Sequence, residues 1–295
     1  MLYKSNGRTI FNIVNYSLLT VLCALCLLPF INLLAISFSG SAAVAAGQVT
    51  FWPVNFTLQS YAFAFRGGKF LAALWVSVQR VALGTSINLI LMILTAYPLS
   101  KNTNKVAGRN IYMGYFVITM LINGGLIPTY LLVSKLGLLN TMWALVLPTA
   151  LPIYSMLILM NFLRSLPGDL EDAALIDGTG PFGALVFIIL PVMKPALATV
   201  GLFSIVAHWN DWFSGMIYIQ HPMNYPLQTY LQSLIVNIED LIKTFSKDYI
   251  KLVNMMNART GRAAQLFLGA LPVIMVYPFL QKYFVTGLII GSVKG

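Results

Sequence analysis

The sequence predicts an all-α membrane protein with six transmembrane helices and both termini in the cytoplasm. Of its 295 residues, 58% are apolar and only 9% are charged, whereas a soluble domain carries about 25% charged residues. The mean hydropathy is +0.80. The apolar residues gather in runs of the ~20 residues that a helix needs to cross a bilayer. The net charge of +10 comes from scattered basic residues, which indicate topology signals and headgroup contacts and no nucleic-acid partner.

Each element follows from one apolar run. The first, 11–38, is longer than the 7–15 residues of a signal-peptide core, so we expect it to remain as a membrane anchor. The second is interrupted only by Arg80 and the fifth only by Lys194, between two prolines. No internal repeat or linker interrupts the pattern, so 1–295 is predicted to be a single transmembrane domain. The six predicted spans are residues 11–38, 70–99, 111–133, 142–163, 182–207 and 263–282.

The basic residues set the predicted orientation. The short segment 101–109 holds three basic residues in nine positions. The basic residues of the opposite side lie mostly in the long segment 208–262, and long loops weigh little in the positive-inside rule. Both termini and the segment 164–182 are therefore expected in the cytoplasm, and 208–262 is expected outside.

The cytoplasmic segment 164–182 is unusually acidic. Four of the eight acidic residues of the chain lie within nine positions here. Residues 166–168, Leu-Pro-Gly, end the fourth span, and an acidic residue can then cap a short helix over 169–177, which Gly178 ends. By spacing alone, a helix that serves a partner and a plain solvated loop are equally supported. The acidic residues are Asp169, Glu171, Asp172 and Asp177.

The same segment resembles a family signature. Asp172-Ala173-Ala174, Gly178 and Ile188-x-Leu190-Pro191 match, at every spacing, the pattern EAA-x3-G-x9-I-x-L-P of importer permeases of ATP-binding cassette (ABC) systems. Asp172 departs from the family's glutamate, which keeps the charge but shortens the reach by one methylene. Other segments resemble the sugar-importing permeases on the maltose-type second-permease side, and the tail resembles the subfamily for complex or acidic oligosaccharides. These segments are 96–100, 140–148, 161–180, 209–213 and 277–295.

The resemblance implies the type I ABC importer permease fold in the bacterial cytoplasmic (inner) membrane. It implies four kinds of protein and lipid partner: a second homologous permease subunit, two cytoplasmic ATPase subunits, an extracytoplasmic solute-binding protein and membrane lipids. The cargo would be an oligosaccharide that carries uronate groups, as alginate or pectin fragments do. The acidic segment would be the coupling helix, which docks in a cleft of an ATPase subunit. The residues assigned to ATPase coupling are Glu171, Asp172, Ala173, Ala174, Asp177, Gly178 and Pro191.

No nucleotide or metal site is expected in the chain itself. A P-loop needs GxxxxGK[ST], and the only Gly-Lys pair, Gly68-Lys69, is followed by Phe70. The two histidines have no cluster of acidic residues near them in the sequence, which disfavours a zinc site. The chain is therefore predicted not to be an enzyme and to hold no cofactor, while ATP and Mg²⁺ bind to the partner ATPase subunits.

The predicted substrate path combines the stretch WNDWF, 209–213, with one arginine. Trp at a span end is typical of the interfacial belt, yet polar residues between two aromatic rings also suit sugar recognition. Arg80 lies within a span, where a charge costs at least ~2.5–3.5 kcal/mol. It either faces a path for an anionic sugar or snorkels to the headgroups. The substrate-path residues are Arg80, Trp209, Asn210, Asp211 and Trp212.

The alternative function is a gradient-driven secondary transporter that acts alone. Such a transporter favours inverted repeats or acidic residues inside the membrane. All eight acidic residues of this chain lie in predicted loops, which disfavours that alternative. A membrane enzyme is disfavoured as well, because no cluster of His, Asp or Ser stands out.

Overall fold

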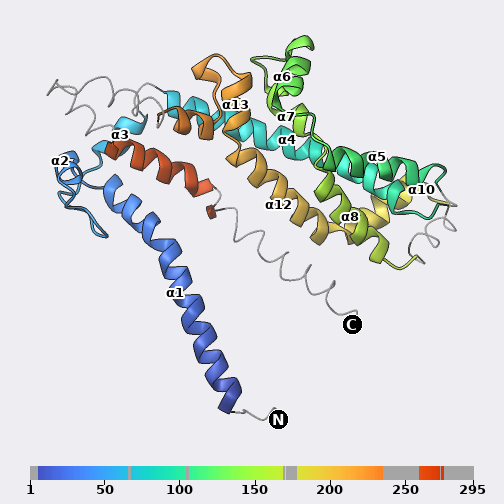
Figure 1. Cartoon of the computed structure of the whole chain (residues 1–295), viewed down its shortest axis with the longest axis horizontal. Helices are drawn as coiled ribbons and strands as arrows, with labels where there is room; N and C mark the ends of the chain where they lie inside the picture. Colours follow the sequence, from blue (N-terminus) through green and yellow to red (C-terminus); the bar gives the residue numbers. More distant parts are fainter. Residues whose placement is uncertain are drawn as a thin grey trace. The chain divides into compact units, whose positions relative to one another are not determined.

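The computed structural model of the chain describes residues 6–65, 68–103, 106–168, 170, 178–234, 259–272 and 274–275. All regular structure in these ranges is helical, which confirms the all-α class. The chain divides into two compact units (Figure 1). The first comprises Met1–Phe70 and Ser233–Leu271, and the second comprises Leu71–Gln232 and Pro272–Gly295.

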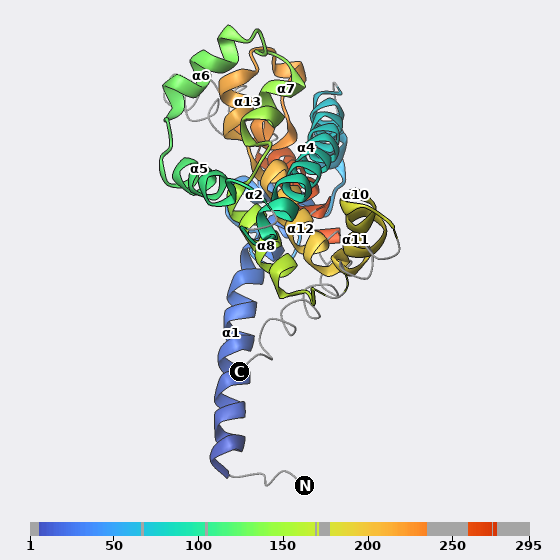
Figure 2. The ribbon, with the colours of Figure 1, turned by 90° about the vertical axis from the view of Figure 1, so that its right-hand side faces the viewer.

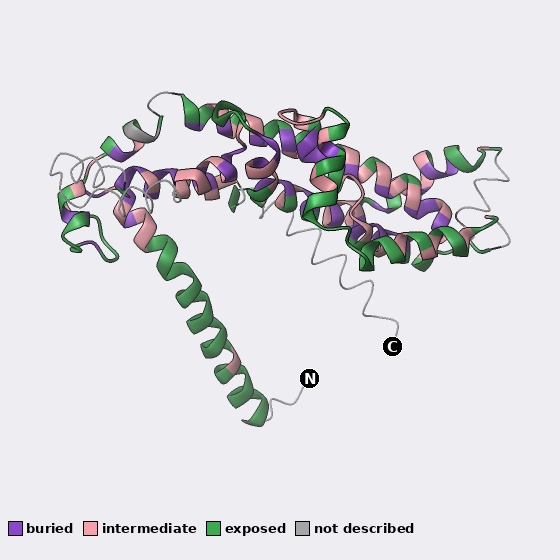
Figure 3. Cartoon of the chain, turned by 45° about the horizontal axis from the view of Figure 1, so that its top comes forward, coloured by how far each residue is buried: buried purple, intermediate pink, exposed green. Residues whose placement is uncertain are grey.

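The first unit is dominated by the long apolar helix α1 (Asn6–Ser37). Its most apolar stretch has a mean hydropathy of 2.5, and only 6% of that stretch is buried, so its side chains are largely exposed along its length (Figure 3). Such a surface suits lipid or another apolar helix and would be unfavourable in water. Beyond α1, the helices α2 (Ser41–Ala45) and α3 (Gln59–Phe65) follow, and Ala35 at the end of α1 packs against Val44 of α2.

The second unit contains the helices from α4 through η3, several of which are labelled in Figure 1. They are α4 (Lys69–Ser100, apart from its first two residues), α5 (Arg109–Leu121), α6 (Leu126–Lys135), α7 (Met142–Val146), η1 (Leu147–Thr149), α8 (Ile153–Ser165), α10 (Pro181–Gly183), the π-helix η2 (Ala184–Ile189), α11 (Leu190–Val192), α12 (Lys194–Asn210), α13 (Phe213–Tyr218) and η3 (Pro222–Asn224).

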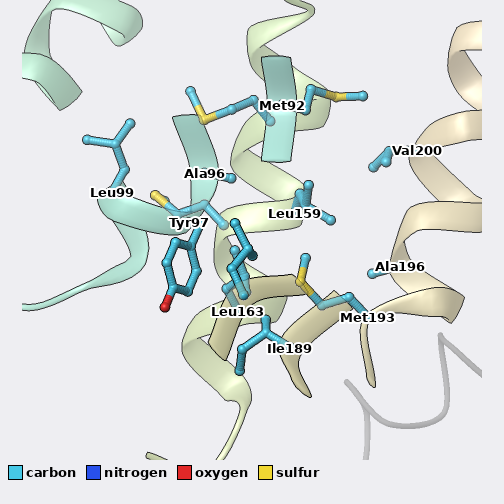
Figure 4. Close-up of a cluster of buried hydrophobic side chains, with 13 residues drawn as sticks. Met92, Ala96, Tyr97, Leu99, Leu159, Leu163, Ile189, Met193, Ala196 and Val200 are labelled. Atoms are coloured by element: carbon cyan, nitrogen blue, oxygen red, sulfur yellow. The ribbon is translucent and has the colours of Figure 1, made fainter. Parts of the chain in front are cut away.

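The core of the second unit lies where α4, α8 and α12 meet (Figure 4). Met92 of α4, Leu159 of α8 and Val200 of α12 are all 0% exposed. Removing a buried Leu or Met side chain from such a core costs about 2–5 kcal/mol, so this cluster fixes the three helices relative to one another. A second buried cluster joins α6, α7 and α13, which gather at one end of the unit (Figure 2).

The described helices correspond to the predicted spans in three ways. α1 and α4 are each long and apolar enough to cross a membrane alone, and they coincide with the first two predicted spans. The next three predicted spans are broken helix pairs, bent by 112° between α5 and α6, by 50° before α8, and by 81° before α12. Of the sixth, 263–282, the structure describes 263–272 and 274–275, which are helical, and the rest lies outside the described residues.

The breaks have local causes that leave the mean hydropathy of each stretch almost unchanged. Gly125 separates α5 from α6 with φ of +89°, a backbone conformation that ends a helix and that glycine adopts most readily. Pro152 precedes α8 and Pro195 is in the first turn of α12. Proline has no backbone N–H, so it cannot donate the hydrogen bond that would join it to the preceding helical turn. Three predicted spans are therefore not straight helices, although each stretch stays apolar throughout.

Basic side chains donate hydrogen bonds to the C-terminal end of α4, which precedes the segment 101–109. The carbonyl of Leu99 accepts hydrogen bonds from Arg109 Nε at 2.8 Å and from Arg164 Nη2 at 3.3 Å. Carbonyls at a helix C-terminus lack intrahelical partners and carry partial negative charge, so cations stabilise them. These two basic residues, which the positive-inside rule treats as topology signals, therefore also stabilise the C-terminal end of α4.

Candidate functional site

A polar cavity of about 750 Å³ lies in the second unit. Its wall comes from α4, from the break before α8 and α8 itself, and from the last turns of α12. That volume lies within the ~300–1,000 Å³ range of small-molecule sites. Most of the lining residues carry a polar group: Arg80, Asn88, Thr149, Tyr154, Ser155, Ser204, His208 and Asp211.

Two rows of residues on facing helices build one side of the cavity. On α4 the row is Arg80, Gly84 and Asn88, spaced four residues apart, so the three lie on one face of the helix. On α12, Ser204 and His208 have the same spacing. A Cβ atom at Gly84 would overlap the His208 imidazole. Gly84 is therefore the position on α4 that leaves room for this ring.

An ion pair lies in the wall of the cavity. Arg80 is 0% exposed, and its Nη2 forms a salt bridge with the Asp211 carboxylate. Arg80 Nη1 also donates to the Asp211 carbonyl at 2.8 Å, and Nη2 donates to the carbonyl of Leu145 in α7 at 3.2 Å. The guanidinium thus ties α4 to α7 and to the C-terminal end of α12, where the helix dipole favours a cation.

The Asp211 carboxylate also accepts hydrogen bonds from Ser214. Its Oδ1 accepts from the backbone N–H of Ser214 at 3.1 Å and its Oδ2 accepts from the Ser214 hydroxyl at 2.5 Å, in the first turn of α13. A partly buried carboxylate is stable when it is paired and hydrogen-bonded in this way.

The ion pair decides between the two interpretations of Arg80. A snorkelling arginine would extend toward headgroups, whereas this guanidinium lies inside the protein and is bound to Asp211. The headgroup interpretation is therefore wrong. The pair also cancels the charge locally, so Arg80 forms part of the cavity wall without presenting an unpaired cation to a ligand.

Asn88 and His208 form a second polar contact, deeper along the same rows. Both are buried, and the Asn88 amide lies 3.3 Å from His208 Nε2. The amide orientation that satisfies every partner has Nδ2 donating to the carbonyls of Ala150 at 3.0 Å and Gly84 at 2.9 Å, with Oδ1 accepting from His208 Nε2. This assignment, made from the hydrogen-bond network, places the imidazole hydrogen on Nε2.

The opposite face of α12 borders a different cavity. Leu202, Ile205 and Trp209 line an apolar cavity of about 290 Å³ together with Val78 and Val81 of α4. Every residue lining that cavity is apolar. Trp209 therefore contributes its ring to a hydrocarbon-like surface and not to the polar cavity.

The structure brings together two of the five residues predicted for the substrate path. Arg80 and Asp211 both line the polar cavity. Asn210 is exposed outside its lining, and Trp212 packs edge-on against Phe213 at 5.6 Å between ring centroids. Sequence reasoning passed over Gly84 and Asn88, although the spacing Arg-x3-Gly-x3-Asn marks a polar face within an apolar span.

The predicted coupling residues are described only in part. Gly178 adopts φ of +79°, as expected of a residue that ends a helix, and Pro191 lies in α11. α8 ends at Ser165, and α10, the next helix with both bounds described, begins at Pro181, close to the predicted ends of the neighbouring spans. The other coupling residues lie outside the described residues: Glu171, Asp172, Ala173, Ala174 and Asp177.

The described residues hold no group of three His, Cys, Asp or Glu side chains arranged to bind a metal ion. The chemistry of the polar cavity is therefore that of hydroxyl, amide and imidazole groups beside a neutralised ion pair. Such a set can hydrogen-bond a polar ligand.

Comparison with known families gives the class of this protein. The family described as "Binding-protein-dependent transport system inner membrane component" matches residues 66–290. That range includes the whole polar cavity and the acidic segment. Because transport in this family depends on a binding protein, the alternative of a transporter that acts alone does not hold.

Individual relatives agree over nearly the whole chain. Protein LplC of Bacillus subtilis (strain 168) is 37% identical over 295 residues, which cover 100% of this chain and 98% of that protein. The polygalacturonan/rhamnogalacturonan transport system permease protein YtcP of the same organism is 35% identical over 286 residues, covering 97% and 99%. A crystal structure of a bacterial ABC transporter involved in the import of the acidic polysaccharide alginate contains a chain that matches with a TM-score of 0.85 and 29% identity, covering 96% and 100%.

These matches also give the chemical role, the location and the family of the chain. Permeases of this family bind no cofactor themselves, and the ATPase activity resides in partner subunits. They are multi-pass proteins of the inner membrane. The chain belongs to the binding-protein-dependent transport system inner membrane components, as a permease subunit of a carbohydrate ABC importer.

Proposed function

We propose that this permease imports an oligosaccharide that carries uronate groups, and that the polar cavity forms part of the route through the membrane. One observation carries the proposal: a cavity of about 750 Å³, most of whose lining residues carry a polar group, lies between helices that correspond to predicted spans. Polar groups inside a membrane protein are costly and usually mark a path for a polar substrate. Arg80 and Asp211 would form one end of that path.

The nature of the cargo is supported by the relatives. YtcP is named for polygalacturonan and rhamnogalacturonan transport, and the matching crystal structure concerns import of the acidic polysaccharide alginate. An importer that takes up an acidic oligosaccharide through this chain is consistent with both. Because Arg80 is already paired, recognition of the cargo's charge is assigned to other groups of the assembled importer.

The assembly that we propose contains six spans in this chain, with both termini in the cytoplasm, and the family's usual partners. These are a second permease subunit, two cytoplasmic ATPase subunits and an extracytoplasmic binding protein that delivers the oligosaccharide. The segment 164–182 would be the coupling element. Its acidic sequence and the turn at Gly178, with φ of +79°, support a short helix that an ATPase subunit can hold.

The test is ATP hydrolysis by the complete importer in lipid nanodiscs. The binding protein is loaded with trisaccharides of galacturonate, of mannuronate or of neutral galactose. We expect a uronate trisaccharide to stimulate hydrolysis more than the neutral one. Stimulation by the neutral sugar alone would contradict the acidic cargo, and the absence of stimulation by any member of a wider oligosaccharide panel would contradict oligosaccharide import.

A further inference from the structure

The two faces of α12 differ in chemistry, and this difference indicates what the polar cavity accepts. Ser204 and His208 face the polar cavity, whereas Leu202, Ile205 and Trp209 face the apolar one. A lipid acyl chain offers only apolar contacts, whereas a ligand with apolar faces and hydrogen-bonding edges matches both kinds of group in the wall of the first cavity. The polar cavity is therefore suited to such a ligand.

The two charges in the cavity wall are already paired with each other. Arg80 and Asp211 bind each other, and Asp211 also accepts two hydrogen bonds from Ser214. A ligand carboxylate would have to compete with the Asp211 carboxylate for Arg80. Neutral donors and acceptors such as sugar hydroxyls meet no such competition. The cavity thus favours the hydroxyl groups of a saccharide over its charge.

His208 offers a defined hydrogen-bonding group to this cavity. Its Nε2–H donates to the Asn88 amide oxygen, so in this tautomer Nδ1 is an acceptor. The ring lies against Gly84, where a side chain would displace it. Asn88 is held in turn by the carbonyls of Ala150 and Gly84. The position and the tautomer of the imidazole are therefore set by the protein before a ligand arrives.

Aromatic rings complete the wall. Tyr154 of α8 and Phe203 of α12 line the cavity, and both residues are exposed. A flat aromatic face suits the apolar face of a sugar ring, while hydroxyls at the ring edge need hydrogen-bond partners. Small-molecule sites commonly combine apolar walls with a few placed polar groups in this way.

We propose that the cavity is a saccharide subsite in which His208 is a specificity-determining residue whose Nδ1 accepts a hydrogen bond from a sugar hydroxyl. Asn88 and Gly84 are positioning residues that fix the tautomer and the place of the ring. The inference rests on the proposed function, because it requires that an oligosaccharide passes through this chain.

The test compares import of a trisaccharide with import of its monodeoxy analogues, using the trisaccharide that the wild-type importer takes up fastest. The binding protein contributes the same preference to every variant, so a change in the rate ratio reports on the permease. A site that hydrogen-bonds a hydroxyl discriminates against the analogue that lacks it. The measured quantity is the import rate of the trisaccharide divided by that of a monodeoxy analogue. For one analogue we expect this ratio to be about fivefold lower in His208→Phe than in wild type, the effect of one lost hydrogen bond.

Two further substitutions separate recognition from a structural role. Asparagine can place an acceptor near the position of Nδ1, whereas glutamine can place its amide near Nε2 and keep the contact with Asn88. We expect His208→Asn to retain most of the discrimination and His208→Gln to lose it. A merely structural histidine predicts the reverse order. Ile205→Ala, on the apolar face of the same helix, is the matched control and should leave the ratio unchanged.

The outcomes are distinct for the two proposals. If the wild-type importer takes up no oligosaccharide, the proposed function fails. If it does and the ratio is the same in wild type, His208→Phe and His208→Gln for every analogue, the subsite assignment is wrong. Should the His208 variants fail to assemble, Ser204→Ala provides a second measurement, because this small change in the same wall should lower the discrimination about twofold, the low end for one hydrogen bond. No change in that variant would likewise overturn the assignment.

Discussion

Arg80 and Asp211 illustrate how a charge is kept inside a membrane helix. They lie 131 residues apart in the sequence, and each provides the other with the partner that the apolar surroundings lack. The sequence singles out both residues, one by its place in an apolar run and the other by its place in WNDWF. Their pairing could not be predicted, because it depends on how α4 and α12 pack.

At this scale we predict that Asp211→Asn destabilises the protein by about 3–5 kcal/mol, because it leaves the fully buried Arg80 without its counter-ion. Arg80→Gln should cost less, because Asp211 is partly exposed and keeps its hydrogen bonds from Ser214. The double variant should lose much less than the sum. Denaturant unfolding of the four proteins in one detergent measures the coupling as a double-mutant cycle. Effects that add to within about 0.5 kcal/mol would show that the pair does not form.

Gly84 allows a different residue-scale prediction. Its substitution by Ala should displace the His208 ring and lower the rate of oligosaccharide import by the assembled transporter severalfold. The control is Gly114→Ala in α5, where nothing lies within 4 Å of an added Cβ and the higher helix propensity of alanine should leave import unchanged or stabilise the helix by up to ~1 kcal/mol. Equal import by both variants would argue against the close approach of Gly84 and His208.

At the scale of whole elements, composition predicts where apolar segments begin and end better than how they bend. The ends of the fourth and fifth predicted spans agree with the structure to within a few residues because Pro, Gly and charged residues mark them. The bends of 112° and 81° were not predicted, because Gly125 and Pro195 interrupt the backbone without making the stretch less apolar. The contact of Asn88 with His208 depends on helix packing and was also beyond sequence reasoning.

The coupling segment carries the prediction for this scale. Gly178 has φ of +79°, whereas proline is restricted to φ near −65°, so Gly178→Pro cannot keep the turn. We expect Gly178→Pro and Asp172→Lys to insert and assemble normally but to abolish oligosaccharide-stimulated ATP hydrolysis. The measurement compares hydrolysis with and without loaded binding protein. Normal uptake by either variant, at a normal protein level, would count decisively against the coupling role.

At the scale of the whole molecule, the family assignment places ATP hydrolysis in partner subunits and the transport route in the permease subunits. The chain has no phosphate-cradling loop of the P-loop type, so the purified chain alone should neither bind nor hydrolyse ATP. Equilibrium binding of a labelled ATP analogue checks this. Stoichiometric binding to the isolated chain would overturn the division of labour between permease and ATPase subunits.

The central claim is that this chain provides part of an ATP-driven route for an oligosaccharide. The most direct measurement is uptake of labelled uronate trisaccharide into proteoliposomes that contain the complete importer and no ion gradient. We predict accumulation only when ATP and Mg²⁺ are present on the ATPase side and binding protein is present on the other. Uptake that proceeds without ATP or without the binding protein, or no uptake with all components present, would contradict the account.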